Sequence, residues 1–459
     1  MLKVYRFKIQ RQDVINVTEG KISKSIVLFA LPILLGNLFQ QLYNVADSLV
    51  VGNVLGKDAL AAVTSTGSLI FLLVGFINGI FVGSGVIISR YYGAKKAERL
   101  STAIHTTLAF AVIAGLLMTV IGASLTPWVL RLVAVPEDVF PQAVIYLRTY
   151  FFGSLAIIIY NACAGIFQAV GDSRRPLYYL IAAAVLNVVL DILFVAVLGY
   201  GVGGAALATV ISQFVSATLA LTKLLKVDKV YRVSVRKIRI NGTMLKNLLQ
   251  MGLPAGVQNS VVGFANVIVQ ANINQFGSIA MAGSGSYTKL EGFAFLPITS
   301  FSMALTTFVG QNLGARKYDR ARRGARFGVI AGVIVAQIIG VIIFAFAPTF
   351  IGFFSDQPEV IEIGTMRARI ISLFYFMLAL SHLLSGILRG LGRTKVPMVV
   401  MLVSWCIIRI AYITVTLRFI PDIRVVFWAY PITWAISVVS FLVYYKRSTW
   451  LFEQGPKLL

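Results

Sequence analysis

The chain has 459 residues, of which 58% are hydrophobic and only 13% are charged, and its mean hydropathy is +0.84. Soluble domains carry about twice that share of charged residues, so these values exclude a soluble protein and indicate a chain embedded in lipid. The net charge of +24 would suit a nucleic-acid partner only if it were clustered on one face.

Twelve apolar stretches follow one another along the chain, each long enough to cross a bilayer as a helix. A hydrocarbon core of about 30 Å needs roughly 20 helical residues, and the stretches lack the alternation of barrel strands. The sequence therefore predicts an all-α polytopic membrane protein. The predicted spans are 25–50, 59–88, 102–126, 142–168, 177–198, 203–225, 247–275, 279–309, 326–347, 360–388, 396–417 and 425–445.

The segment Met1–Gly20 lacks the apolar centre of a signal peptide, so we expect the first span to act as an uncleaved insertion signal. Cys163 and Cys406 both fall inside predicted spans. We expect two buried thiols there rather than a disulfide.

Lys and Arg concentrate in every second connection between spans, and the alternate connections hold almost none. This is the positive-inside pattern, so we expect a multi-pass protein of the cell membrane with both termini cytoplasmic. The basicity then reflects topology, and we expect the lipid bilayer rather than nucleic acid as a partner. The basic segments are the N-terminal tail, 89–100, 171–176, 223–246, 314–326, 389–395 and the C-terminal tail.

Three pairs of similar segments recur along the chain at one offset in residue number, constant to within one position. The offset covers six spans, an even number, so both copies enter the membrane in the same direction. Such parallel repeats predict two six-helix bundles around a central cleft, which would give alternating access by a rocking motion. The pairs are ALPILLGNLFQ from Ala30 with GLPAGVQNSV from Gly252, RYYGAKKAER with QNLGARKYDR, and AGIFQAVGDSRRP with SGILRGLGRTKVP.

The repeat divides the chain into two bundles, a linker and two tails. We expect a cytoplasmic tail at 1–24, the first bundle at 25–225, a basic cytoplasmic linker at 226–246, the second bundle at 247–446 and a cytoplasmic tail at 447–459.

At these residues the chain resembles the multidrug and toxic compound extrusion (MATE) family of secondary transporters, prokaryotic type. The marks are the leucine-proline that opens each half, the Gly-Ala-basic loops, and the VGQNLGA run at Val309–Ala315. The resemblance extends from Ser23 to about Lys446. It implies an antiporter that exports amphipathic, cationic small molecules in exchange for H⁺ or Na⁺.

Three acids lie well inside spans: Asp47, Asp191 and Glu291. A charged carboxylate at mid-membrane costs several kcal/mol unless it pairs, meets water or takes up a proton, and a group that loads and releases a proton can couple transport to a gradient. Polar residues share one face with each aspartate, so we hypothesise that the two converge in the first bundle as a cation or proton site. The alternative is that the two aspartates only hold helices together through hydrogen bonds. These neighbours are Gln40, Tyr43 and Asn44 for Asp47, and Asn187 for Asp191.

The family resemblance extends this hypothesis. Asn187, Asp191 and Thr209 match positions that some prokaryotic members use to bind a cation, which would make Asp47, Asn187, Asp191 and Thr209 a candidate Na⁺ site, with Tyr43 beside it. Asp47 follows Pro32 on the same span. In those members, protonation of the first-span aspartate is proposed to bend the helix at its proline, and an internal proline permits such a kink.

The second half departs from the first at these positions. The repeat offset carries Asp47 to Val269 and Asp191 to Tyr412, so we expect coupling in the first bundle only. Pro254 is the counterpart of the first-half proline. We assign the neutral and acidic polar residues of the spans to the substrate cleft, with hydrogen bonding between helices as the equal alternative for the seventh-span amides. The assigned residues are Gln40, Asn44, Gln258, Asn266, Gln270 and Glu291.

Two other functions compete with drug export. A flippase for a lipid-linked precursor, from the same superfamily, would need cationic groups to hold phosphate, and Arg409, Arg148 and Lys289 are the candidates. A membrane-embedded enzyme lacks support, because the chain has two histidines and neither a metal-ligand cluster nor a nucleophile or phosphate-loop motif. We expect no enzyme activity, no cofactor and no bound metal other than the coupling ion, and a functional monomer.

Overall fold

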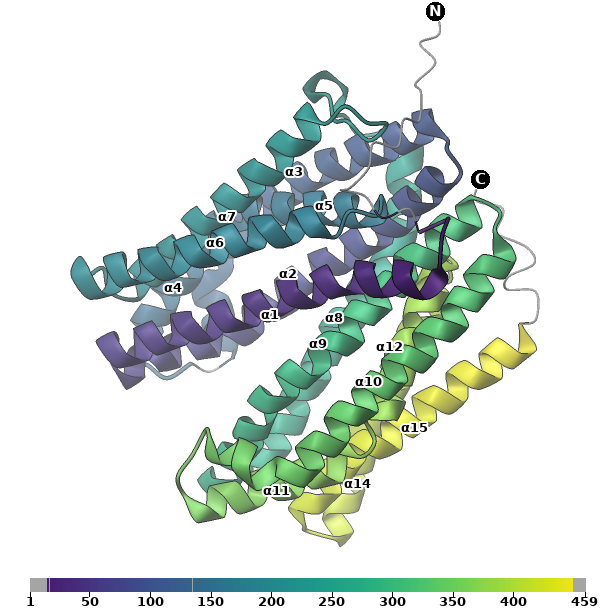
Figure 1. The fold of residues 1–459 in the computed structure, drawn as a ribbon. Coiled ribbons are helices and arrows are strands. Elements are labelled where there is room, and N and C mark those ends of the chain that lie inside the picture. The colour runs from purple at the N-terminus through teal and green to yellow at the C-terminus, as the bar shows by residue number, and fades with distance from the viewer. Residues whose placement is uncertain (1–14, 16, 134, 449–459) are drawn as a thin grey trace, which may run out of the picture. The chain divides into compact units, whose positions relative to one another are not determined.

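The structure is a computed structural model that describes residues 15, 17–133 and 135–448, and every regular element among them is helical (Figure 1). The first-half helices are α1 (Ile22–Leu55), α2 (Lys57–Gly93), α3 (Ala97–Leu132), α4 (Phe140–Phe152), α5 (Ser154–Ala169), α6 (Arg174–Asp191), the π-helical η1 (Ile192–Val197) and α7 (Gly201–Lys226). After the short 3₁₀ turn η2 (Val235–Lys237) come α8 (Gly242–Asn274), α9 (Ser278–Gly314), α10 (Tyr318–Gly352), α11 (Pro358–Ser372), α12 (Tyr375–Gly390), α13 (Lys395–Met401), the π-helical η3 (Leu402–Ile408), α14 (Arg409–Phe419) and α15 (Ile423–Arg447).

Ten helical stretches are long and apolar enough to cross a membrane, and the number rises to 12 if each of two bent pairs is one span. The bent pairs are α4 with α5, at 49°, and α11 with α12, at 55°. The first bend lies at Gly153, where an added Cβ would stand 2.5 Å from Val210 Cγ2. The prediction of a polytopic all-α membrane protein with about 12 spans is confirmed.

The backbone repeats with the offset read from the sequence. At both of its ends α9 follows α2 by that offset, and α12 follows α5 in the same way. Three pairs of described residues with left-handed backbone repeat as well: Gly56 with Gly277, Gly171 with Gly392, and Lys95 (φ 56°) with Arg316 (φ 58°). Non-glycine residues rarely adopt this conformation, so its recurrence after both Gly-Ala motifs marks one turn geometry used twice.

The chain divides into two compact units. Each unit includes the beginning of the first helix of the opposite sequence half. Unit 1 contains Leu35–Gly256 and unit 2 contains Val17–Leu34 with Val257 onward. Thus α1 changes unit shortly after Pro32, and α8 changes unit shortly after Pro254. Both prolines lie inside their helices, where each removes one backbone hydrogen bond.

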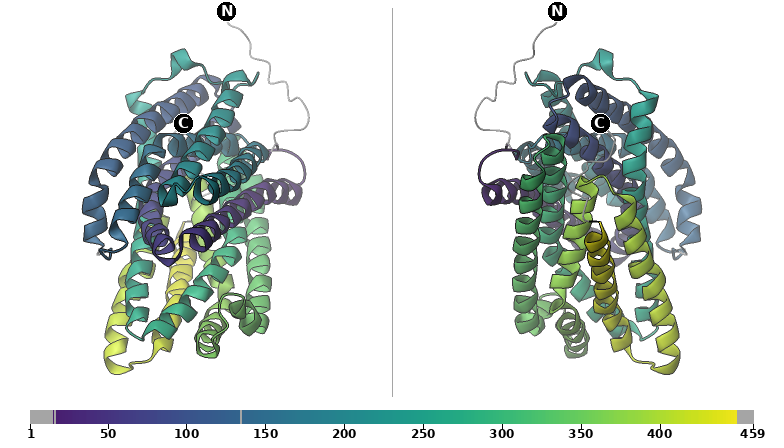
Figure 2. Two further views of the ribbon diagram at one scale, coloured as in Figure 1. Left: turned by 90° about the vertical axis from the view of Figure 1, so that its left-hand side faces the viewer. Right: turned by 90° about the vertical axis from the view of Figure 1, so that its right-hand side faces the viewer.

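In unit 1, the first part of α8 packs on α2 through glycines. A Cβ added to Gly79 would lie 2.4 Å from Gly256 Cα, and one added to Gly83 would lie 2.3 Å from Gly252 Cα. Two glycines one turn apart on each helix therefore bring the backbones into contact, as in small-residue interfaces between membrane helices. In unit 2, α14 and α15 lie side by side, as the right-hand view of Figure 2 shows.

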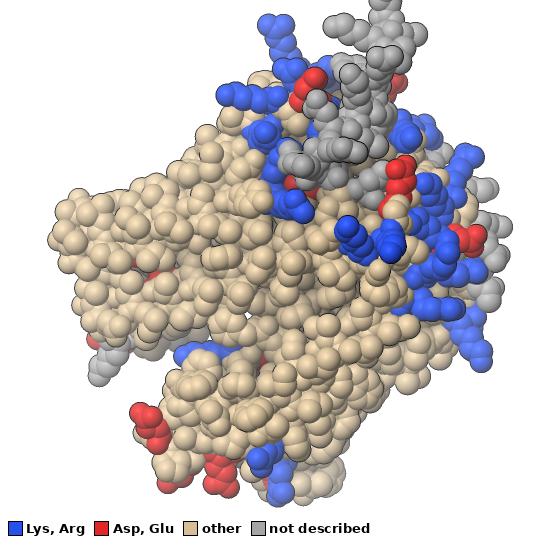
Figure 3. All heavy atoms as spheres, in the orientation of Figure 1, with Lys and Arg blue, Asp and Glu red and all other residues tan. Residues whose placement is uncertain are grey.

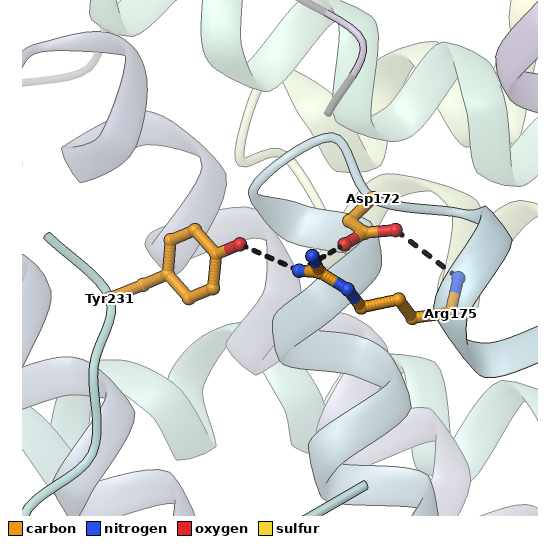
Figure 4. Close-up of polar contacts among 3 residues, drawn as sticks. All are labelled: Asp172, Arg175 and Tyr231. Atoms are coloured by element: carbon orange, nitrogen blue, oxygen red, sulfur yellow. Dashed lines mark hydrogen bonds and ion pairs between the residues drawn. The ribbon is translucent and has the colours of Figure 1, made fainter. Parts of the chain in front are cut away.

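The linker between the halves is held on unit 1 by hydrogen bonds. Arg175 forms an ion pair with Asp172 (2.8 Å) and donates to the hydroxyl of Tyr231 in the linker (3.2 Å), as Figure 4 shows. Further along, the backbone N–H of Ser234 donates to His105 Nε2 (3.0 Å). Burial raises the pKa of Tyr231 above its usual value, so its hydroxyl stays neutral.

In unit 2, the VGQNLGA run and the residues after it form hydrogen bonds with the segment before α1. Asn312 donates to the carbonyl of Val17 (3.1 Å), and Arg320 donates to the carbonyls of Glu19 and Gly20 (both 2.7 Å). The start of α1 is thereby tied to α9 and α10. This contact gives the sequence motif a structural role.

Many exposed Lys and Arg side chains gather at helix ends, with Arg148 on α4 and Lys289 on α9 as exceptions inside helices. In unit 2 the exposed Arg316, Lys317, Arg322 and Arg323 lie where α9 ends and α10 begins, and Lys446 lies near the end of α15. In Figure 3 most of the blue side chains on the visible face lie together, beside broad tan areas. The exposed large hydrophobic residues of α3, such as Leu117, Val120 and Ile121, suit contact with lipid tails.

Candidate functional site

The structure brings the two first-half aspartates together inside unit 1. Asp47 lies on the second half of α1 and is 7% exposed, and Asp191 ends α6 and is 0% exposed. Their carboxyl groups are joined by a hydrogen bond. Such a bond needs a proton, because two ionised carboxylates in contact repel each other. The pair can therefore hold one proton, or a cation in its place.

Asn187, one turn before Asp191, connects the pair to α7. Its amide donates to Asp191 Oδ2 (3.0 Å) and accepts from the backbone N–H of Thr209 (3.2 Å). The Thr209 hydroxyl lies 3.4 Å from the same amide and also bonds to the Tyr43 hydroxyl. All five residues that the sequence analysis assigned to coupling thus lie in one hydrogen-bonded group.

The group retains unused acceptors. Within the described part of the chain, Asp47 Oδ1, Asp191 Oδ1 and the Ser212 hydroxyl are buried without a hydrogen-bond partner. Buried polar atoms in this state are costly. Beside them is a cavity of about 10 Å³, lined by Tyr43, Leu180, Ala183, Ala184, Asn187, Thr209, Ser212 and Gln213. That volume suits one water molecule or one bare monovalent cation.

The backbone is irregular where it supports the acid pair. The π-helical turn η1 begins at Ile192, directly after Asp191. Such turns are rare and often occur at functional sites. Tyr146 of α4, buried and in electrostatic contact with both aspartates, is a neighbour that the sequence analysis missed. The repeating polar faces of α1 and α6 gave no signal for a residue on a third helix.

Glu291, which the sequence analysis assigned to the substrate cleft, has two cationic neighbours. It lies on α9 in unit 2, accepts a hydrogen bond from Tyr287, and is within electrostatic range of Arg367 and Arg409. Arg409 was a sequence candidate, but Arg367 of α11 was missed. Its position as a cation inside the predicted span 360–388 was the available signal.

The amides assigned to the substrate cleft occupy different environments. Gln40 and Asn44 are exposed on the part of α1 in unit 1. On α8 in unit 2, Asn266 is exposed, and the half-buried Gln270 donates to Asn274 (2.8 Å). Gln258 is buried within unit 2 and donates to Met401 Sδ.

The three cations considered for a flippase also differ. Arg409 is 2% exposed and bonds to Thr433 through Nε (3.1 Å) and Nη2 (2.8 Å). Arg148 is exposed and donates to the carbonyl of Ala123. Lys289 is exposed and lies over the ring of Phe354.

Comparison with known proteins finds the same fold and family. The chain is 29% identical over 447 residues to the "Probable multidrug resistance protein YoeA" of Bacillus subtilis, which covers 95% of this chain and 96% of that protein. It is 27% identical to the "Probable multidrug resistance protein NorM" of Thermotoga maritima, over 84% of this chain and 83% of the relative.

Among solved structures, an "Outward-facing conformation of a multidrug resistance MATE family transporter of the MOP superfamily" matches with a TM-score of 0.90 and 22% identity, covering 97% of this chain and all of that one. A transporter from Pyrococcus furiosus described by "Reverse polarity of binding pocket suggests different function" matches equally well, over 96% and 99%. The MatE family model matches twice, at residues 32–193 and 254–415. This chain therefore belongs to the MatE family, as the resemblance of its motifs predicts.

Proposed function

We propose that the protein is an antiporter that exports amphipathic, cationic small molecules in exchange for H⁺ or Na⁺ bound at Asp47 and Asp191. The observation that carries the proposal is the contact of two buried carboxyl groups with unused acceptor atoms on both. The curated relatives named as multidrug resistance proteins support the substrate class. The Lys and Arg side chains at helix ends support the placement of those ends on the cytoplasmic side of a cell membrane.

In this mechanism the acid pair alternates between a state with the coupling cation bound and a state without it. Uptake of one proton or Na⁺ lowers the charge of the two carboxylates from −2 to −1, and its release restores the second negative charge. Because Asp47 lies on α1, a change in that charge acts on the helix that passes from one unit to the other just after Pro32. The exposed amides Gln40, Asn44 and Asn266 are the proposed substrate contacts.

The test is efflux by Asp47→Asn and Asp191→Asn proteins in liposomes under an imposed pH or Na⁺ gradient. One-for-one exchange of a cation for a cationic molecule moves no net charge, so a tenfold pH or Na⁺ gradient, about 1.4 kcal/mol, supports about tenfold accumulation. We expect both variants to lose the accumulation driven by the gradient. Asp58→Asn is the matched control, because Asp58 is exposed in the first turn of α2. Unchanged driven efflux in both site variants would reject the coupling assignment.

A second candidate, a flippase for a lipid-linked precursor, is favoured by one observation, the buried Arg409 with Arg367 beside it. Cationic groups of this kind could hold phosphate. Selective binding of a lipid-linked oligosaccharide, without binding of cationic drugs, would support the flippase over the antiporter.

A further inference from the structure

The interior of unit 2 carries an excess of positive charge. Arg367 and Arg409 are 3% and 2% exposed. Among the acids that follow Val257 in the described part of the chain, only Glu291 is neither exposed nor at a helix end. The two guanidinium groups and one carboxylate therefore leave a net charge of one in the centre of the unit. A buried charge of this kind is costly unless it is balanced.

The surroundings of Arg367 hold its cation without neutralising it. The guanidinium donates to the carbonyl and hydroxyl of Ser284, and it lies over the rings of Tyr287 (5.0 Å) and Tyr430 (5.4 Å). Its Nε, within the part of the chain that the structure describes, is buried without a partner. Neutral hydroxyls and rings solvate a cation but add no negative charge.

Arg409 is held in the same way. It bonds to the Thr433 hydroxyl and lies over the rings of Tyr430 (4.4 Å) and Trp405 (5.6 Å). Both guanidinium groups thus contact the ring of Tyr430. Glu291 is half-buried, so this centre includes one partly exposed charged group.

The repeat places this centre where unit 1 has its acid pair. Moving back by the repeat offset takes Arg409 to Asn187 or its neighbour, and Tyr430 to Thr209 or its neighbour. Thr209 and Asn187 support two carboxyl groups in unit 1. In unit 2 the counterparts of α6 and α7 carry Arg409 and its partners Tyr430 and Thr433, whereas Arg367 comes from α11, the counterpart of α4. The backbone therefore repeats while the buried charge is reversed.

We propose that Arg367 and Arg409, with Glu291 as their internal counter-ion, form a binding site for the oxyanion group of an amphipathic substrate, a carboxylate or a phosphate. Guanidinium groups bind such oxyanions through parallel N–H donors. The aromatic residues Tyr287, Trp405 and Tyr430 suit an aromatic or apolar body next to the anionic group. The inference rests on the proposed function only in treating the bound molecule as transported, and it differs from that function in giving the molecule an anionic group.

The test measures thermal unfolding of the full-length protein in lipid nanodiscs with benzoate, phenyl phosphate or benzamide. Benzamide has nearly the shape of benzoate without its charge, and phenyl phosphate distinguishes a phosphate site from a carboxylate site. A ligand that binds the native state raises the unfolding midpoint. We expect at least one of the two anions, but not benzamide, to raise it in the wild-type protein.

Three variants make the test specific. Arg409→Gln should weaken binding of the effective anion about tenfold, because a hydrogen bond to a charged group is lost. Glu291→Gln should strengthen it several-fold, because the competing carboxylate is removed. Arg389→Gln is the matched control: this interior arginine bonds to Ser302 on α9, outside the centre, and should bind like the wild type.

The increase in Glu291→Gln cannot come from a misfolded protein, so it keeps the proposal testable if Arg409→Gln is unstable. Equal effects of the anions and benzamide, or weaker anion binding in Glu291→Gln, would overturn the inference. Because no gradient is used, that result is separate from a failure of Asp47→Asn and Asp191→Asn to impair driven efflux.

Discussion

The polar centres of the two units differ in sign although they lie on repeated helices. Unit 1 joins Asp47 to Asp191 with Asn187, Thr209 and Tyr43 around them. Unit 2 has Arg367 and Arg409 facing one carboxylate. A duplicated backbone therefore fixes where a polar centre can be buried but not which charge it carries. Each half can thus specialise, one for a cation and the other for an anion.

The strongest way to break the comparison is to disrupt unit 1 itself. Gly83→Leu would force a side chain into the backbone of Gly252, where even a Cβ would lie 2.3 Å from Cα. Neither backbone can yield, so we expect a loss of about 3 kcal/mol or more and little folded protein by size-exclusion chromatography. Gly67→Leu on the same helix is the control, because nothing lies within 4 Å of its Cβ position. Normal yield of Gly83→Leu would refute this packing.

Two threonines, one at each polar centre, sharpen the comparison. Thr209→Val removes the hydroxyl that bonds Tyr43, and Thr433→Val removes the one that bonds Arg409. A lost hydrogen bond of this kind costs about 1–2 kcal/mol. We expect driven efflux to fall several-fold in Thr209→Val but not in Thr433→Val, and anion binding to weaken only in Thr433→Val. The same change in both assays for both variants would mean that the two centres do not have separate roles.

A smaller effect should follow from loosening the linker at unit 1. Tyr231→Phe removes the hydroxyl that accepts from Arg175, while Asp172 keeps its ion pair with that arginine. We expect a loss of about 1 kcal/mol, seen as a lower unfolding midpoint with unchanged ion coupling. Tyr178→Phe, at an exposed tyrosine of α6, should show no change. Altered coupling in Tyr231→Phe would give the linker a functional role.

The smallest effect belongs to an ion pair at the surface of unit 2, which sets a baseline for the buried charges. Hydrogen bonds from the side chain and backbone N–H of Arg424 hold the pKa of Asp422 below its usual value of about 3.9. The resulting stability is present above about pH 3.9 and is lost as the pH falls through the lower folded pKa. Because the pair is exposed, we expect less than about 1 kcal/mol, measured as a difference in acid unfolding between wild type and Asp422→Asn. A larger difference would contradict the assignment of this pair to the surface.

Much of this architecture can be predicted from the sequence because lipid imposes simple rules. Apolar length predicts the spans, and three motif pairs predict the repeat. The shared faces of Asp47 with Tyr43, and of Asp191 with Asn187, predict their place in a polar group, since i, i+4 residues lie on one side of a helix.

The remainder depends on contacts between distant residues. The apolar pattern continues through Pro32 and Pro254, so nothing in it shows that α1 and α8 divide between the units. Arg367 was missed because its aromatic partners Tyr287 and Tyr430 come from other helices, and only the fold brings them together.

The most direct test of the account is to count the cations released when a substrate binds. In weakly buffered solution, a pH indicator and a Na⁺-sensitive dye would follow the purified protein as a cationic drug is added. We predict release of about one H⁺ or Na⁺ per drug bound by the wild type, as expected for one shared ion at a carboxyl pair, and none by the Asp47→Asn/Asp191→Asn double variant. The same release from the double variant would show that the coupling ion is held elsewhere.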